Sequence, residues 1–503
     1  MNATLPDNAT ALDYLQLYLT DAIMDVIVEQ TNKYAEQYIA KNVIKPHSSV
    51  KHWIPTTRDE MVAFFGLCVL MGIVYKPRLT MYWSTDAVYQ TDVFPSIMSR
   101  DRFLLLLRFL HFADNSAVSA TQQRRDRMYK LKPIVDMIRD RCKSVYTPGR
   151  DLCVDESLLL FKGRLAFKQF IKTKRARFGI KFFELCTKNG MMMDFMVYTG
   201  DMSNQLVAVP DCEFLMSERI PLTFLQPYQN QGYRLFVDNF YTSTRLAEFM
   251  SENGTTLVGT VRPNRRDFPT ALADVAIEKG EAKFALSDNG VLAVKFRSHK
   301  DKSGKKPKIV YMLTTCHTNA IAASSKKDKD GNSIMKPTCV LEYNKCMGGV
   351  DLVDQQLDSL LVIRKNYKWY KKVFFRLLLQ CMFNAHKLMQ RQGKQDFLKF
   401  LHDAVTLMVA ISPRVHRSTC GLDSIARLTG RNHFPSKRSY AGAGRQRTSK
   451  SKKCRVCLAR GRRTDKGAAI ETTWVCETCP SVPGLCVDTG CFRDYHLKFD
   501  YSQ

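Results

Sequence analysis

Three short acidic clusters lie in a chain that is otherwise rich in lysine and arginine. They centre on Asp155, on Asp238 and on the pair Asp351 and Asp354. A single aspartate near a strand end is usually a turn former or a helix cap. Several carboxylates within a positive surface are instead typical of sites that hold divalent cations beside a phosphate backbone. That chemistry cuts or joins nucleic acid.

The residues around these carboxylates favour metal binding. Val154 and Val237 are apolar neighbours that would bury a carboxylate, and a metal ion would relieve that cost. Asp351 and Asp354 follow two glycines at the start of a predicted helix, and their spacing puts them on one face. Glu156 points to the opposite side of its strand and is left out of the site. Two ions about 4 Å apart could activate a water or a 3′-hydroxyl and stabilise the leaving oxygen.

The charge balance indicates a polyanionic partner. The 503 residues include 76 Lys and Arg against 48 Asp and Glu, a formal charge of +28. Such an excess favours nucleic acid or an anionic membrane through counterion release. No apolar stretch approaches the roughly 20 residues that a membrane helix needs, and the N-terminus lacks the organisation of a signal peptide. We therefore expect nucleic acid as the partner and no membrane.

A basic segment follows the first acidic cluster. Its positive residues are Lys162, Arg164, Lys172, Lys174, Arg175, Arg177 and Lys181. A solvated sheet edge is the alternative, but closeness to the expected metal site favours phosphate contact. We select Lys174, Arg177 and Lys181 as DNA contacts. Asn239 joins them because it directly follows Asp238 and can hydrogen-bond a base or a phosphate.

Six of the 16 cysteines crowd into the last fifty residues, followed by a histidine. The candidate ligands are Cys454, Cys457, Cys476, Cys479, Cys486, Cys491 and His496. Two CxxC pairs with later Cys and His residues are a strong zinc signature, and metal binding would supply the folding energy of so polar a segment. Two tetrahedral sites need eight ligands, so Asp488 or another residue completes the second site, or one zinc binds firmly. The other ten cysteines are scattered and read as reduced.

The segment before this cluster, 431–453, is rich in Arg, Lys, Ser and Gly and reads as a basic linker. Its charge favours DNA contact and nuclear import. A disordered tail would carry the same charge. We expect a nuclear protein.

The element pattern divides the chain into regions that can position these residues. Residues 10–145 have mostly helical spacing, with an exposed loop expected over 115–127. Strands are expected at 151–161, 180–187, 191–198 and 234–237, with the turn Asn189-Gly190 joining the second and third. Short helices are expected around 213–217 and at 243–253, which gives an α/β core.

Downstream of this core, the sequence becomes β-prone and basic over 259–332, which we interpret as an insertion. Helices are then expected at 350–361, 371–392 and 397–410.

Five sequence strings, taken together, resemble the piggyBac family of DNA transposases. They are VDESLLLFKGR, KTKRARFGIKFFELC, FVDNFYTSTRL, GTVRPNRR and YNKCMGGVDLVDQ. Their order and approximate spacing match the family, and the resemblance runs from about Leu12 to the C-terminus. It implies a multidomain α/β protein: an RNase H-like catalytic core with a β-rich insertion, helical DNA-binding and dimerisation segments, and a small C-terminal zinc-binding domain.

The resemblance also implies roles for particular residues. Asp155, Asp238 and Asp351 match the three catalytic aspartates, which bind Mg²⁺ or Mn²⁺, and Asp354 is a closely associated fourth. Arg262 and Arg265 match positions that handle target DNA. Trp369 matches an aromatic position near the active site that could stack on a flipped base, although a core or helix-surface role is equally open.

The implied activity is cut-and-paste transposition by a DDE/D-type enzyme. The element is excised by hydrolysis and strand transfer through hairpin ends and enters double-stranded DNA at TTAA, with the protein acting as a homodimer. The alternative is a domesticated, nuclear DNA-binding protein without cleavage. A zinc-dependent regulator with purely structural acidic clusters would leave their ordered match unexplained.

The expected domain limits follow from these regions. They are a helical domain at 1–147, a catalytic core at 148–258 and 336–375, an insertion at 259–335, a helical segment at 376–430, a basic linker at 431–453 and a zinc-binding domain at 454–503.

Overall fold

The computed structural model describes residues 2, 4–117, 119–172, 177–207, 214–298, 308–327, 331–360, 368–391, 393, 395–411, 433–437, 451–479, 482–498 and 501. The chain divides into two compact units, Met1–Arg414 and Val415–Gln503. Within the described residues, none of the helices has the length and apolarity needed to cross a membrane.

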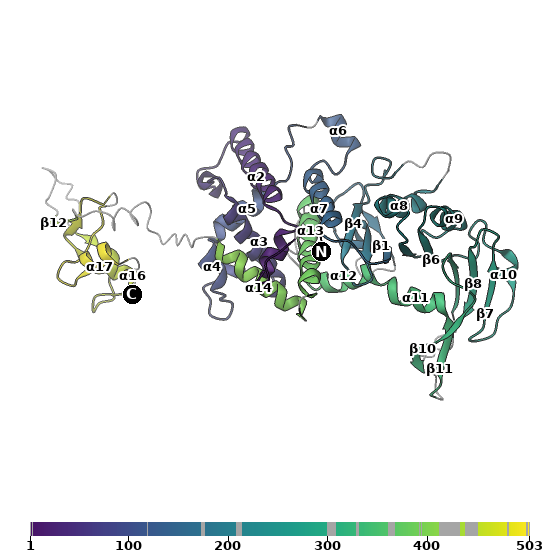
Figure 1. Cartoon of the computed structure of the whole chain (residues 1–503). Helices are drawn as coiled ribbons and strands as arrows, with labels where there is room; N and C mark the ends of the chain where they lie inside the picture. The colour runs from purple at the N-terminus through teal and green to yellow at the C-terminus, as the bar shows by residue number, and fades with distance from the viewer. Residues whose placement is uncertain are drawn as a thin grey trace. The chain divides into compact units, whose positions relative to one another are not determined.

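Helices from both ends of the first unit pack into one bundle (Figure 1). Its N-terminal members are α1 (Ala11–Gln16), α2 (Asp21–Lys41), η1 (Ser49–His52), α3 (Arg58–Ile73), η2 (Leu79–Trp83), α4 (Val93–Ile97), α5 (Arg100–Phe109) and α7 (Lys132–Val145). The short helix α6 (Ala120–Arg125) stands apart from them (Figure 1). The later members, α13 (Trp369–Met389) and α14 (Phe397–Ile411), contact α1, and α14 also packs along α3. The Phe65 and Phe374 ring centroids lie 5.1 Å apart at the α3–α13 contact.

One helix lies where we expected an exposed loop over 115–127. Ser119 caps α6, and its hydroxyl accepts a hydrogen bond from the backbone N–H of Gln122. The Gln122 side chain accepts a bond from the Ser119 backbone in return. This capping box satisfies two donors that an isolated helix start would leave unpaired. The prediction of a loop was wrong because it relied on the polar composition of the segment and overlooked the capping box.

The centre of the first unit is a mixed sheet whose core order is β4-β3-β1-β5-β6. The core strands are β1 (Asp151–Leu160), β3 (Phe178–Thr187), β4 (Met192–Val197), β5 (Arg234–Val237) and β6 (Thr256–Thr260), with the short β2 (Gln169–Phe170) beside β3. β1, β3 and β4 are antiparallel, whereas β5 and β6 run parallel to β1. Three antiparallel strands followed by two parallel ones form the RNase H-like arrangement.

The Asn189-Gly190 turn between β3 and β4 is present as predicted. Gly190 has φ of +84°, a conformation that side chains with a Cβ rarely adopt. A Cβ there would also lie 3.0 Å from Val353 of α12 (Gly349–Leu357), so glycine allows this helix to pack on the turn.

The insertion extends the core sheet. β9 (Ile309–Thr314) pairs antiparallel with β6, and β8 (Leu292–Arg297) and β7 (Ala282–Leu286) follow it. The hairpin of β10 (Ile321–Lys327) and β11 (Ser333–Pro337) forms a separate sheet and leads into α11 (Thr338–Cys346). The insertion also contains α10 (Thr270–Asp274), whereas α8 (Met216–Leu225), η3 (Gln226–Tyr228) and α9 (Thr244–Glu252) belong to the core, between β4 and β6.

The second unit is built from short elements. They are β12 (Pro435–Lys437), β13 (Lys452–Lys453), α16 (Arg455–Ala459), β14 (Glu471–Thr472), β15 (Trp474–Cys476) and α17 (Cys491–Leu497). β12 pairs with β15, and β13 pairs with β14. Two stretches that we assigned to the basic linker are therefore strands of this unit. Most of the linker's basic residues lie outside the described residues.

Candidate active site and zinc centres

The first two predicted aspartates lie on neighbouring parallel strands: Asp155 is midway along β1, and Asp238 directly follows the end of β5. Val154 of β1 is in register with Val237 of β5, so Asp155 and Asp238 are the next residues on each. The backbone N–H of Phe240 donates to Asp238 Oδ1 over 2.9 Å. Burial raises the pKa of Asp238, and a bound cation would favour its charged form.

Helix α12 brings Asp351 to the same edge of the sheet. A Cβ on Gly349 would lie 2.3 Å from the Thr187 carbonyl oxygen and 2.7 Å from the Cys153 thiol, so only glycine lets the helix start this close to β1 and β3. One turn later, the Ser157 hydroxyl donates to Asp354 Oδ1 over 2.6 Å. These two contacts hold α12 to β1 on either side of Asp155.

The three candidate carboxylates differ in exposure and in their distance from one another. Asp351 is exposed in the first turn of α12, whereas Asp155 and Asp238 are partly buried. Among the described side chains, the oxygens of these three residues are not all within 4.8 Å of one another. The structure therefore brings β1, β5 and the start of α12 together, but it does not gather the three carboxylates into one set of ligands.

Asp354 takes part in a buried ion network. Arg376 of α13 donates to Asp354 Oδ1 over 2.7 Å, and its guanidinium lies 3.5 Å from Glu184 Oε1 of β3. The Arg376 and Glu184 side chains are 7% and 2% exposed. Burial alone would lower the pKa of Arg376, but the two carboxylates outweigh it and raise the pKa, so the arginine stays charged. This network favours a positioning role for Asp354.

Replacing Arg376 by methionine is expected to destabilise the first unit by about 3 kcal/mol, because Asp354 and Glu184 would lose their shared cation in a buried site. The measurement is urea unfolding followed by tryptophan fluorescence. The matched control is Lys399→Ala, which breaks the exposed pair with Asp403 at 3.1 Å and should cost less than about 1 kcal/mol. Equal losses in the two variants would contradict the network's importance.

The predicted DNA contacts lie in different environments. Arg262 is exposed, and its Nε donates to Asn239 Oδ1 over 3.1 Å. Arg265 is partly buried and donates to the carbonyl oxygens of Thr242 and Phe240, so it holds the loop that follows Asp238.

The basic segment after β1 divides in the same way. Lys181 lies 2.5 Å from Glu156 with a side chain only 13% exposed. Arg177 is exposed, and Lys174 lies outside the described residues. Trp369 is partly buried, and its ring meets Phe167 edge-on with centroids 5.4 Å apart. The ring contact favours a structural contribution from this tryptophan.

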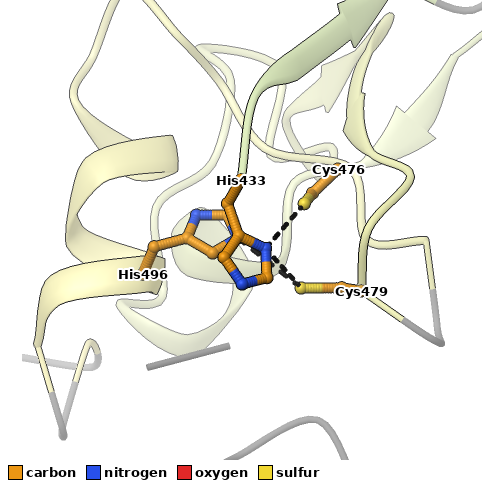
Figure 2. Close-up of side chains that lie close together, drawn as sticks. All are labelled: His433, Cys476, Cys479 and His496. Atoms are coloured by element: carbon orange, nitrogen blue, oxygen red, sulfur yellow. Dashed lines mark hydrogen bonds between the residues drawn. The ribbon is translucent and has the colours of Figure 1, made fainter. Parts of the chain in front are cut away.

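The cysteines and histidines of the second unit form two groups of four, and within each group all ligand atoms lie within 4.8 Å of one another. One group is Cys454, Cys457, Cys486 and Cys491, and the other is His433, Cys476, Cys479 and His496. Figure 2 shows the second group, with both cysteine sulfurs directed at the histidine rings. Along the chain the ligands of the two groups are interleaved, with three cysteine pairs between His433 and His496, which is a cross-brace.

The separations within these groups fit zinc. His433 Nδ1 lies 3.3 Å from Cys476 Sγ, and Cys479 Sγ lies 3.5 Å from His496 Nε2. A tetrahedron with bonds of about 2.0–2.3 Å has edges of roughly 3.3–3.8 Å. His496 Nδ1 lies 2.8 Å from the Phe492 carbonyl oxygen, a bond that leaves Nε2 for the metal.

The eighth ligand, His433, was missed because it lies in the stretch assigned to a linker. The pairing of β12 with β15 places Pro435 opposite Cys476 and so brings His433 to the site. Asp488, our named candidate, is exposed and belongs to neither group. The sequence did show that one ligand was missing, since seven were identified where two tetrahedral sites need eight. His433 is a histidine upstream of the cluster that could have filled this place.

Comparisons with known proteins agree with this geometry. Residues 10–386 match the family described as Transposase IS4, and residues 440–497 match a DDE_Tnp_1-like zinc finger. The piggyBac transposase in a cryo-EM synaptic complex with hairpin DNA is 26% identical, with a TM-score of 0.66 over 82% of this chain and 83% of that one.

Two human proteins are also similar. "PiggyBac transposable element-derived protein 3" is 27% identical over 78% of this chain and 63% of its own length. "PiggyBac transposable element-derived protein 2" is 26% identical over 76% of this chain and 63% of its own length. The chain thus spans just under two thirds of these relatives.

The two family matches place the chain in the DDE class of transposase-related proteins. Within this class, the chain belongs to the piggyBac family, whose fold it shares over 82% of its length.

Proposed function

We propose that this protein is a cut-and-paste DNA transposase that excises an element through hairpin ends and inserts it at TTAA. The observation that carries the proposal is the shared edge formed by Asp155, Asp238 and the start of α12. Carboxylates on two adjacent parallel strands and a glycine-seated helix suit two divalent cations and a phosphodiester. The similarity to a transposase in complex with hairpin DNA supports the same reading.

We assign the cation ligands to Asp155, Asp238 and Asp351, with Mg²⁺ or Mn²⁺ as the ion. The ions would activate a water or a 3′-hydroxyl and stabilise the leaving oxygen. Asp354 was expected as a fourth ligand, but its bonds to Ser157 and Arg376 suit it to holding α12 in place.

The DNA would approach this edge across a positive surface. Arg177 and Arg262 are exposed and suited to phosphate contact, and Asn239 is oriented by its bond with Arg262. Lys181 and Arg265 would act indirectly, since each is already bonded to residues that shape the site. We further propose that the protein acts as a homodimer on paired element ends in the nucleus. The net charge of +28 supports the DNA partner of this proposal.

A domesticated DNA-binding protein is the second candidate, because the two human relatives are named as derived from transposable elements. The deciding experiment incubates the full chain with DNA carrying its own element's ends, with Mg²⁺ or with chelator. The transposase predicts nicks and hairpins at the ends that require the metal and vanish when the end sequence is scrambled. Specific binding to authentic ends without cleavage would establish the second candidate instead.

A further inference from the structure

A cysteine, a histidine and a glutamate lie in line near the start of β5. This is the end of the strand opposite to Asp238. Cys316 and His317 directly follow β9, and Cys316 Sγ lies 3.5 Å from His317 Nδ1. On the other side of the ring, His317 Nε2 lies 3.3 Å from Glu342 Oε2 of α11. Arg234, at the start of β5, lies 2.5 Å from the same glutamate oxygen. Since Asp238 follows the end of β5, this cluster and the catalytic edge lie at opposite ends of the strand.

The geometry suits proton transfer from the thiol to the ring. The His317 side chain is only 7% exposed, so its orientation is fixed by its surroundings. The Thr314 hydroxyl lies 2.8 Å from Nδ1 and accepts the backbone N–H of Cys316, which ties the three residues into one turn. A base within reach of a thiol, itself oriented by a third group, is the arrangement that activates cysteine nucleophiles.

Cys316 also differs from the other cysteines of the first unit in its access to solvent. It is partly exposed, whereas the others that the structure describes there are buried. The buried ones are Cys68, Cys142, Cys153, Cys186, Cys339, Cys346 and Cys381. A thiol must be both ionised and reachable to react, so access singles out Cys316.

The electrostatics of the cluster agree with this geometry. Burial raises the pKa of the Cys316 thiol, but the hydrogen bond and charge of His317 outweigh burial and lower the pKa below its usual 9.0. Burial likewise lowers the pKa of His317, but Cys316 and Glu342 outweigh it and raise the pKa above 6.5. Each partner therefore stabilises the charged form of the other.

We propose that Cys316 is a reactive thiolate site for small disulfides, with His317 as its base and Glu342 as the orienting group. The Cys316 proton passes to His317 Nδ1, and the thiolate sulfur attacks one sulfur of the disulfide. The disulfide's S–S bond breaks as the new S–S bond to Cys316 forms. The other half of the disulfide leaves as a thiolate. Such an adduct lies beside α11, the helix that leads into α12.

The test is the reaction of the full-length protein with 5,5′-dithiobis(2-nitrobenzoate), a small aromatic disulfide. The rate at each cysteine is read by quenching and peptide mapping, which separates Cys316 from the zinc ligands. We expect Cys316 to react first at pH 7 and the fast phase to vanish in Cys316→Ser. Cys346→Ser, which removes a buried thiol from the same region, should leave the fast phase unchanged.

The role of the histidine is tested by His317→Phe, with Glu342→Gln as a second variant should the first fail to fold. Either change should slow the Cys316 reaction about tenfold or more at pH 7, since an ordinary thiol is only a few per cent ionised there. The variant and native rates should converge above about pH 9.5, where any thiol is ionised. Equal rates at pH 7, or a fast phase that survives Cys316→Ser, would overturn the proposal.

Discussion

Replacing Asp155 by asparagine is expected to slow metal-dependent DNA cleavage at least about a thousandfold. The amide keeps the size of the side chain but removes the negative charge that holds a cation, and the cations contribute several kcal/mol to transition-state stabilisation. Asp155 and Asp238 follow the register partners Val154 and Val237, so the two carboxylates lie on adjacent strands and could bind the same cations. The measurement is single-turnover cleavage of labelled DNA carrying the element ends in Mg²⁺.

Two controls separate lost chemistry from lost structure. Asp288→Asn changes an exposed aspartate in the β7–β8 turn by the same substitution and should cleave at the native rate. The melting temperature of Asp155→Asn should stay close to the native value, because the asparagine amide oxygen can still accept the bond from the Glu156 backbone N–H. Cleavage by the Asp155 variant within about tenfold of the native rate would show that this carboxylate is not a ligand.

The core of this site could be predicted because its signals are local. Asp155 lies within one strand pattern and Asp238 at the end of another, and the parallel register of β1 with β5 places the two residues next to each other. The Gly348-Gly349 pair indicated the start of a helix. The need for glycine at position 349, however, comes from tertiary packing. Its backbone meets the Thr187 carbonyl oxygen and the Cys153 thiol, which lie far away in the sequence.

The parts that could not be predicted depend on long-range partners. Nothing around Arg376 in the sequence indicates that it meets Glu184 and Asp354, since the three are brought together by packing of α13 on the sheet. The insertion gave a β-rich pattern, but its continuation of the core sheet depends on β9 pairing with β6. The local composition of two strands that are distant in the sequence does not indicate that they pair or in which register.

Removing zinc is expected to unfold the second unit while the first stays folded. The buried cluster of the second unit consists of eight residues. Five of them are the ligand cysteines Cys454, Cys457, Cys476, Cys479 and Cys491. Among the described residues of that cluster, only Val456, Leu485 and Tyr495 are not ligands, so metal binding must supply most of the stability, on the order of 10 kcal/mol. The measurement is limited proteolysis of the full chain before and after chelation. Fragments should come from the second unit alone.

The number of zinc ions bound by two variants identifies the eighth ligand. His433→Ala removes one corner of the His433, Cys476, Cys479 and His496 group and should reduce bound zinc from two ions per chain to about one. Asp488→Asn should leave both ions in place, because this aspartate is exposed and belongs to neither group. Zinc released by thiol modification and counted with a colorimetric chelator gives the stoichiometry. Two ions in His433→Ala, together with a loss in Asp488→Asn, would reverse the assignment and return the segment before Cys454 to the status of a linker.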